Sequence, residues 1–238
     1  MASPHRVPAP RRRRGGSWAF RLGLVLVGAG VVLLGYVGWQ LYGTNYVSQQ
    51  RHDRTVEALL EEWREDGVNG PDADPGAASS GTVPSGGSSA DAIIRVPAFG
   101  EDYAVPLIEG VDDEALASGL GHFPESAAPG EPGNFALAGH RITHGEPLRA
   151  MTDLEAGDEI IVETRDRIHT YVLDTGGDDL RVPFTATWVV GPTPVNPAGG
   201  VSPTPDETHL ITVTTCAELF HTDDRLVAFG HLVESRPR

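Results

Sequence analysis

The stretch HLITVTTC, residues 209–216, together with RLVAFGHLVE, residues 225–234, indicates the fold of this chain. Apolar and polar side chains alternate with a period of two in the first segment, which is typical of a β-strand. By that alternation Thr214 and Cys216 share one polar face at the end of the strand. The turn-like residues between the two segments let the chain return antiparallel, which would place Arg225 beside Cys216.

Short apolar runs of the same kind recur through residues 92–238, a length sufficient for one core. The other predicted strands are Ile93–Val96, Tyr103–Ile108, Asn134–Ala138, Glu159–Glu163, Thr170–Leu173 and Thr187–Val190. Glycine and proline turns separate them, which favours an all-β barrel or sandwich. Only Asp112–Ser118 and a turn around Pro147–Asp153 look helical, and Asp178–Pro183 fits either a loop or a strand.

The N-terminal end resembles a membrane anchor. Residues 1–21 carry six arginines and no acid, and an uncharged, mostly apolar stretch follows from Leu22 to Tyr42. About 20 apolar residues span a bilayer as a helix, and arginines stay on the cytoplasmic side. We therefore expect a single-pass signal anchor with a cytoplasmic N-terminus and an extracytoplasmic body; a long, cleaved signal peptide is the alternative.

Residues 43–91 are expected to form an extracytoplasmic stalk. Within 51–66, apolar residues recur at helical spacing, which predicts a short amphipathic helix. Residues 67–91 are rich in Gly, Ser and Pro and hold almost no large apolar side chain, which predicts a disordered linker.

The charge of the body excludes one class of partner. The 238-residue chain has a formal net charge of −15, and all 33 of its acidic residues lie beyond residue 50. Because such an acidic body repels phosphate backbones, we expect no nucleic-acid binding. The single cysteine excludes both an intrachain disulfide framework and a Cys-rich zinc site.

Three residue types form the candidate catalytic set. A lone thiol on an exported protein is exposed to oxidation unless it is buried or used, so Cys216 is either a reactive nucleophile or a small buried residue. A guanidinium at Arg225 would stabilise a thiolate or an oxyanion; the alternative is a surface arginine paired with Asp223 or Asp224. His140 follows the apolar run NFALA, at another strand end.

Other histidines compete with His140 for the role of acid–base group: His122, His144, His169, His209, His221 and His231. The motif HRITH, residues 140–144, spaces two histidines by four, which would suit a metal on a helix. Its neighbours do not predict a helix and no acidic ligand stands out, so we expect no metal.

These motifs resemble the sortase family, in its class E or actinobacterial housekeeping form. The resemblance rests on FALAGHR (135–141), on ITVTTC (211–216) and on the arginine nine residues beyond the cysteine. The segment from Arg95 to Arg141 also resembles the entry segment of class E sortases, and in all about 145 residues are covered.

The resemblance implies an eight-stranded sortase β-barrel with short helices, in which Cys216 is the nucleophile, His140 the general acid–base and Arg225 the oxyanion or orienting group. It implies no cofactor. The substrates would be secreted proteins with a C-terminal LAxTG- or LPxTG-type sorting signal, joined through a thioester to a peptidoglycan amine. We expect four residues to bind substrate: Thr214, Thr215, His122 and Phe123. Phe123 stands where class E sortases often have a tyrosine, and Ala217–Glu218 stand where His–Pro often follows the cysteine.

Two other functions are consistent with the sequence. The chain could be a non-catalytic, membrane-tethered β-barrel that binds a partner, or a cysteine peptidase that hydrolyses instead of ligating. The leading prediction is a membrane-anchored cysteine transpeptidase with its catalytic domain in residues 92–238.

Overall fold

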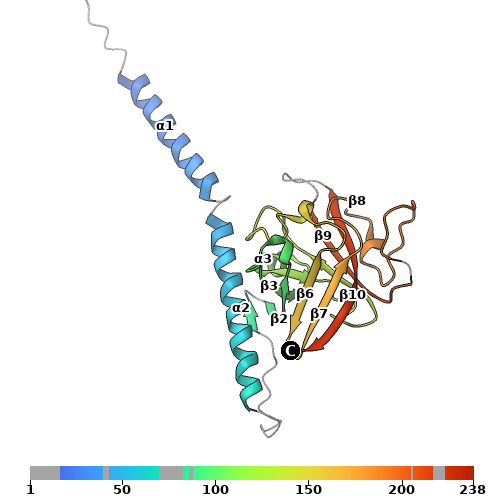
Figure 1. Cartoon of the computed structure of the whole chain (residues 1–238). Coiled ribbons are helices and arrows are strands. Elements are labelled where there is room, and N and C mark those ends of the chain that lie inside the picture. The colour runs from blue at the N-terminus through green and yellow to red at the C-terminus, as the bar shows by residue number, and fades with distance from the viewer. Residues whose placement is uncertain (1–16, 40–42, 70–82, 86–87, 205, 217–222) are drawn as a thin grey trace, which may run out of the picture. The chain divides into compact units, whose positions relative to one another are not determined.

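A computed structural model describes residues 17–39, 43–69, 83–85, 88–204, 206–216 and 223–238 (Figure 1). The chain divides into two compact units, Met1–Gly43 and Thr44–Arg238. The first contains helix α1 (Ser17–Gly38), whose described side chains are mostly exposed. Residues 20–38 are long and apolar enough to cross a membrane, by length and composition. The predicted anchor began later, at residue 22, and residues 40–42 of it lie outside the described residues.

The second unit is built around a closed barrel of eight strands, as predicted (Figure 1). Their order around the barrel is β2 (Ser88–Arg95), β3 (Val105–Glu109), β4 (Leu120–His122), β5 (Gly133–Ala138), β9 (His209–Cys216), β10 (Asp224–Pro237), β7 (Arg167–Leu173) and β6 (Glu159–Thr164). The β6–β2 pairing closes the ring. The β3–β4 and β5–β9 pairs are parallel and the other pairs in the ring are antiparallel. Closure leaves no free sheet edge in the ring.

Two short strands extend this sheet. Strand β1 (Val83–Ser85) pairs with β2, and β8 (Leu180–Pro183) pairs with the start of β10. The region of Asp178–Pro183, which fitted a loop or a strand, therefore includes a strand.

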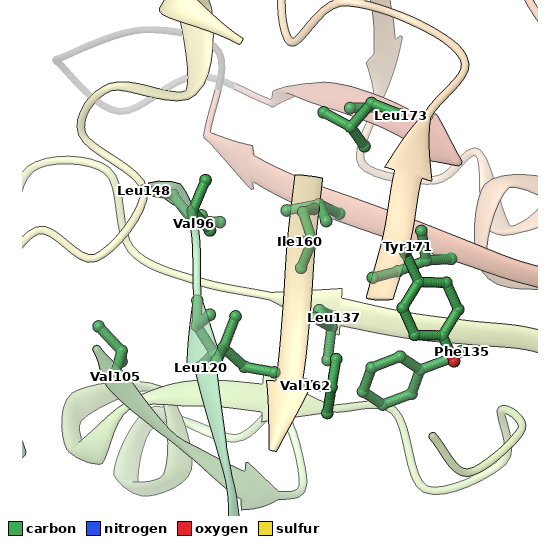
Figure 2. Close-up of a cluster of buried hydrophobic side chains, with 14 of the residues drawn as sticks. Val96, Val105, Leu120, Phe135, Leu137, Leu148, Ile160, Val162, Tyr171 and Leu173 are labelled. Atoms are coloured by element: carbon green, nitrogen blue, oxygen red, sulfur yellow. The ribbon is translucent and has the colours of Figure 1, made fainter. Parts of the chain in front are cut away.

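The barrel interior is filled by side chains that alternate inward along each strand. Phe135 and Leu137 of β5 meet Tyr171 of β7 in this cluster, and all three are at most 1% exposed (Figure 2). The rings of Phe135 and Tyr171 lie 6.0 Å apart. Burial of each large apolar side chain stabilises the fold by roughly 1.5–3 kcal/mol. The packed interior therefore makes the barrel a rigid support for the loops at its ends, where functional residues are usually found.

The short helices lie between strands. Helix α3 (Asp113–Ser118) begins after Asp112, whose side chain accepts hydrogen bonds from the N–H groups of Glu114 and Ala115. This N-cap explains why the predicted helix forms there. The turn around Pro147–Asp153 contains the 3-10 helix η3 (Met151–Asp153), and η2 (Pro97–Phe99) follows β2.

The prediction of a strand at Thr187–Val190 was wrong, because this segment is the 3-10 helix η4 (Thr187–Val190). The backbone carbonyl of Val189 in this helix and that of Gly191 just after it accept hydrogen bonds from side chains instead of from a neighbouring strand. Asn134 Nδ2 donates to Val189 O at 3.2 Å and to Gly191 O at 2.9 Å, and Thr212 Oγ1 donates to Val189 O at 3.0 Å. Val189 is buried in one cluster with Phe229 of β10, and Trp188 and Val190 pack against that cluster, so the hydrophobicity of this segment has a packing role without strand pairing.

The predicted stalk also differs from the structure. The helix in it, α2, runs over Thr44–Asn69 instead of 51–66. Its buried residues Val56, Leu59 and Trp63 pack in one cluster with side chains of β2, β3 and α3. The apolar stripe predicted for this helix therefore covers the barrel, and α2 belongs to the same unit as the barrel.

Part of the predicted linker 67–91 also belongs to regular structure. Residues 67–69 end α2, and residues 83–85 and 88–91 belong to β1 and β2. The small side chains that suggested disorder allow close packing, and Thr55 Oγ1 of α2 lies 3.3 Å from Ser85 Oγ of β1. Residues 70–82 and 86–87 of this prediction lie outside the described residues.

Candidate active site

Cys216 and Arg225 lie opposite each other at one end of the barrel. Strands β9 and β10 are antiparallel, and their register pairs Cys216 with Arg225. Directly opposite residues of an antiparallel pair point to the same face of the sheet, with Cβ atoms about 4.5–5.5 Å apart. The thiol is half-buried, and Arg225 Nη1 donates to the backbone oxygen of Asp224 at 3.1 Å.

His140 reaches the same end of the barrel from β5, which runs parallel to β9. The register pairs Ala138 with Thr214, so the two strands end side by side. Beyond that pair, Gly139 N donates to Thr214 O at 3.2 Å and Thr215 Oγ1 donates to Gly139 O at 2.8 Å. Both bonds hold the residue that directly precedes His140, so β9 positions the histidine as well as the cysteine.

A cavity of about 600 Å³ lies at this end of the barrel, and His140, Cys216 and Arg225 all line it. The volume is in the range of sites for small organic ligands and short peptides. Apolar side chains make up much of its wall: Val111, Leu116, Val182, Phe184, Val189 and Val190. The three candidate catalytic groups therefore line one mostly apolar cavity, in which water shields charges poorly.

The environment of His140 favours a neutral ring. Burial, reinforced by the nearby imidazole of His144, lowers the pKa of His140 from 6.5 to about 4, and Asp113 acts weakly in the opposite direction. The centroids of the two rings lie 4.7 Å apart, with the ring planes tilted by 31°. At neutral pH His140 can therefore accept a proton, which a base needs in order to activate a thiol.

Three of the four predicted substrate-binding residues line the cavity: Thr214, Thr215 and Phe123. His122 does not line the cavity. Its ring is buried, with its centroid 5.2 Å from that of the Phe135 ring, Nδ1 2.7 Å from Glu109 Oε2 and Nε2 3.0 Å from Ala127 O. Successive residues of an extended chain point to opposite sides, so His122 packs away from the cavity that Phe123 lines.

The residues 140–144 do not form the helix that a metal site would need. They lie in the loop after β5, and the His140 and His144 rings contact each other at a tilt. Among the described residues, no group of three or more His, Cys, Asp or Glu side chains is arranged to hold a metal ion.

Sequence reasoning missed several residues around the site. Asp113 influences the charge of His140, and Phe184 and Val189 form part of the cavity wall. All three come from segments far from the candidate motif in sequence. Pairing of β8 with β10 and the bonds from Asn134 to η4 bring the last two into place, and no local pattern predicts either contact.

Comparison with known proteins identifies a family with which this chain shares sequence similarity. The Sortase domain family matches residues 94–233. Sortase SrtE1 of Streptomyces coelicolor is 33% identical over 227 residues, which cover 91% of this chain and 58% of that protein. The present chain thus spans about three fifths of the length of that relative.

Two solved structures share the fold. Sortase E from Streptomyces avermitilis is 32% identical with a TM-score of 0.54, covering 62% of this chain and 90% of that one. Sortase E1 from Streptomyces coelicolor, solved with a tripeptide in the active site, is 32% identical with a TM-score of 0.52, covering 63% of this chain and 91% of that one. With its closed eight-stranded barrel and a family match over more than half of its length, the chain belongs to the sortase family.

Proposed function

We propose that this protein is a membrane-anchored cysteine transpeptidase that cleaves a C-terminal LAxTG- or LPxTG-type sorting signal and transfers the secreted protein to a peptidoglycan amine. The observation that carries the proposal is that Cys216, His140 and Arg225 line one cavity although they come from three strand ends. Membership of the sortase family supports the same chemistry.

In the first half-reaction, Cys216 Sγ attacks the threonine carbonyl carbon of the signal. The neutral imidazole of His140 takes the thiol proton as the C–S bond forms. Arg225 donates to the oxyanion of the tetrahedral intermediate, a contribution typically of about 2.7–4 kcal/mol for one such donor. The C–N bond to glycine then breaks, His140 returns the proton to the leaving amine, and a thioester remains on Cys216.

In the second half-reaction, an amine of the cell wall attacks the thioester carbonyl. His140 takes a proton from the incoming amine, and the C–S bond breaks to release the thiolate, which is reprotonated. One amide bond replaces another of similar energy, so the exchange needs no external energy source. The apolar wall of the cavity favours the amine over water, because fewer polar groups hold water beside the thioester.

The shape of the cavity supports a short peptide as ligand. Thr214, Thr215 and Phe123 line it, and we assign them to substrate binding. The relative from Streptomyces coelicolor that holds a tripeptide in its active site supports the same assignment. Phe123 contributes an apolar ring without a hydroxyl group, so selection at this wall depends on shape and apolar contact.

The location we propose is the outer face of the cell membrane. Residues 22–42 would form the single-pass anchor, residues 1–21 the cytoplasmic tail, and the barrel would lie outside. The apolar helix over residues 20–38 and the arginines that precede it support this orientation.

The test uses the full chain in detergent micelles, with LAxTG and LPxTG peptides and with oligoglycine or a diaminopimelate-containing stem peptide as the amine. Mass spectrometry should show a thioester on Cys216 and an amine-dependent ligation product. Cys216→Ala should abolish both. Cleavage that is unaffected by amine would indicate a peptidase, and the absence of thioester, cleavage and ligation would favour a non-catalytic binding module.

A further inference from the structure

The loop after His140 contains an unusual turn. Three consecutive residues, His144, Gly145 and Glu146, have positive φ angles of 52°, 84° and 55°. Positive φ is natural for glycine, whereas each residue with a side chain costs on the order of 1–3 kcal/mol in this region. Such a turn persists only where the surrounding structure holds it in place.

Helix α2 supplies that restraint through two side chains at i and i+4 spacing, which places them on one face of the helix. Gly145 N donates to Asn45 Oδ1 at 3.2 Å, and Gln49 Nε2 donates to Gly145 O at 3.3 Å. Asn45 Nδ2 also donates to Glu146 Oε1 at 2.6 Å. Both backbone groups of the central glycine are therefore bound by α2.

Packing at the same point leaves no room for movement toward the helix. The ring of His52, one turn further along α2, is only 3% exposed and lies against Gly145. A Cβ atom at residue 145 would lie 2.9 Å from His52 Cε1. The glycine is thus required both for its backbone angle and for the close approach of α2.

The turn is linked directly to the candidate acid–base group. Leu148 N donates to His140 O at 3.0 Å, which closes the loop. The His144 ring, on the first residue of the strained turn, contacts the His140 ring, with the centroids 4.7 Å apart and the planes tilted by 31°. A shift of the turn would therefore move the surface against which His140 rests.

We propose that Asn45 and Gln49 are positioning residues, through which α2 holds the 144–146 turn and thereby keeps the His140 imidazole in register with the thiol. This inference rests on the proposed role of His140 in transpeptidation. It makes α2 a part of the catalytic unit, where the sequence had predicted only a stalk.

The anchoring of α2 separates this role from general stability. Val56, Leu59 and Trp63 fasten the helix to the barrel about two to four turns beyond Gln49. Removing the amide groups of Asn45 and Gln49 leaves that apolar contact intact, so the variants should stay folded with α2 docked.

The experiment compares the full-length Asn45→Ala/Gln49→Ala double variant with wild type in detergent, in the peptide ligation assay. The matched control is Gln50→Ala, because Gln50 is the adjacent residue of the same type and its side chain is hydrogen-bonded to Tyr46 and Arg54 of α2. We expect kcat to fall about 10- to 100-fold in the double variant, since a misplacement near 1 Å costs up to about 10²-fold, with KM changed less than about threefold. The control should match wild type.

Two further measurements keep the inference open to refutation. The NMR signals of the His140 and His144 rings should shift in the double variant and not in Gln50→Ala. Gly145→Ala should cause a comparable loss of kcat, and combining it with Asn45→Ala/Gln49→Ala should add less than about threefold, because both act through one contact.

The outcomes distinguish this inference from the proposed function. An active wild type with kcat per folded molecule unchanged in the double variant would overturn the inference and leave the function standing. A lower unfolding free energy with unshifted ring signals and unchanged kcat would show a structural role only, which also overturns it. A wild type that forms no thioester would refute the proposed function itself, whatever the ring signals show.

Discussion

Acid should destabilise this protein through the buried imidazole of His52. Burial, with the charges of Arg51 and His144, lowers the pKa of His52 from 6.5 to about 4, and its side chain lies under the loop that carries His144 and Gly145. Below pH 6.5 the unfolded chain takes up a proton at this residue, whereas the folded protein stays neutral there until about pH 4. The unfolded state then binds more protons, so the free energy of unfolding falls as the pH falls.

The size of the effect follows from the two pKa values. Full loss of this contribution, reached below about pH 4, corresponds to about 3.4 kcal/mol, since one pKa unit equals about 1.4 kcal/mol. Between pH 7 and pH 5 the loss should be about 2 kcal/mol. His140, His144 and His169 change in the same direction, because burial also lowers their pKa values. The contribution of His52 therefore has to be measured as a difference between proteins.

The assay is urea unfolding of the full chain in detergent, followed by tryptophan fluorescence, because Trp63 is buried between α2 and the barrel. Wild type and His52→Leu are compared at pH 7 and pH 5, with Gln50→Leu as a control that does not titrate. The gap in unfolding free energy between wild type and His52→Leu should move by about 2 kcal/mol in favour of the variant on acidification. If this gap changed by less than about 0.5 kcal/mol between pH 7 and pH 5, the reasoning would be refuted.

Other substitutions test the site itself. Arg225→Ala should lower kcat/KM for the signal peptide about 10²- to 10³-fold, the usual effect of losing one oxyanion donor, and an unchanged value would exclude its proposed role. Thr215→Val removes the 2.8 Å bond to Gly139 O, so urea unfolding should show a loss of about 1–3 kcal/mol and the ligation assay a lower kcat; wild-type values in both would contradict this. Asn134→Leu leaves the Val189 and Gly191 carbonyls without this donor and should cost about 2–4 kcal/mol in unfolding free energy, whereas a loss below about 0.5 kcal/mol would show that η4 does not depend on it.

Strand positions were predictable because alternation is a local property. The pattern of residues 209–216 needed only its neighbours in sequence to indicate a strand, and β9 covers those residues. The apolar run 187–190 shows the limit of this reasoning. It has the composition of a strand, yet the side chains of Asn134 and Thr212, distant in sequence, bind its carbonyls and hold a 3-10 helix.

The stalk prediction failed for a related reason. Helical spacing correctly marked an apolar stripe on 51–66, but the stripe alone does not say what covers it. Its partners are Ile93, Ile108 and Ala115, which become neighbours only when the barrel closes. The same closure determines that Phe123 lines the cavity while His122 is buried.

The sequence alone determined an apolar N-terminal segment, an all-β body and three side chains with suitable chemistry. These features were predictable because hydrophobic spacing and residue chemistry depend only on nearby positions in the sequence. Tertiary structure decided that His140, Cys216 and Arg225 line one cavity, and that α2 binds both sides of Gly145. Those relations depend on strand register and on packing between segments about 100 residues apart, and such contacts exist only after the chain has folded.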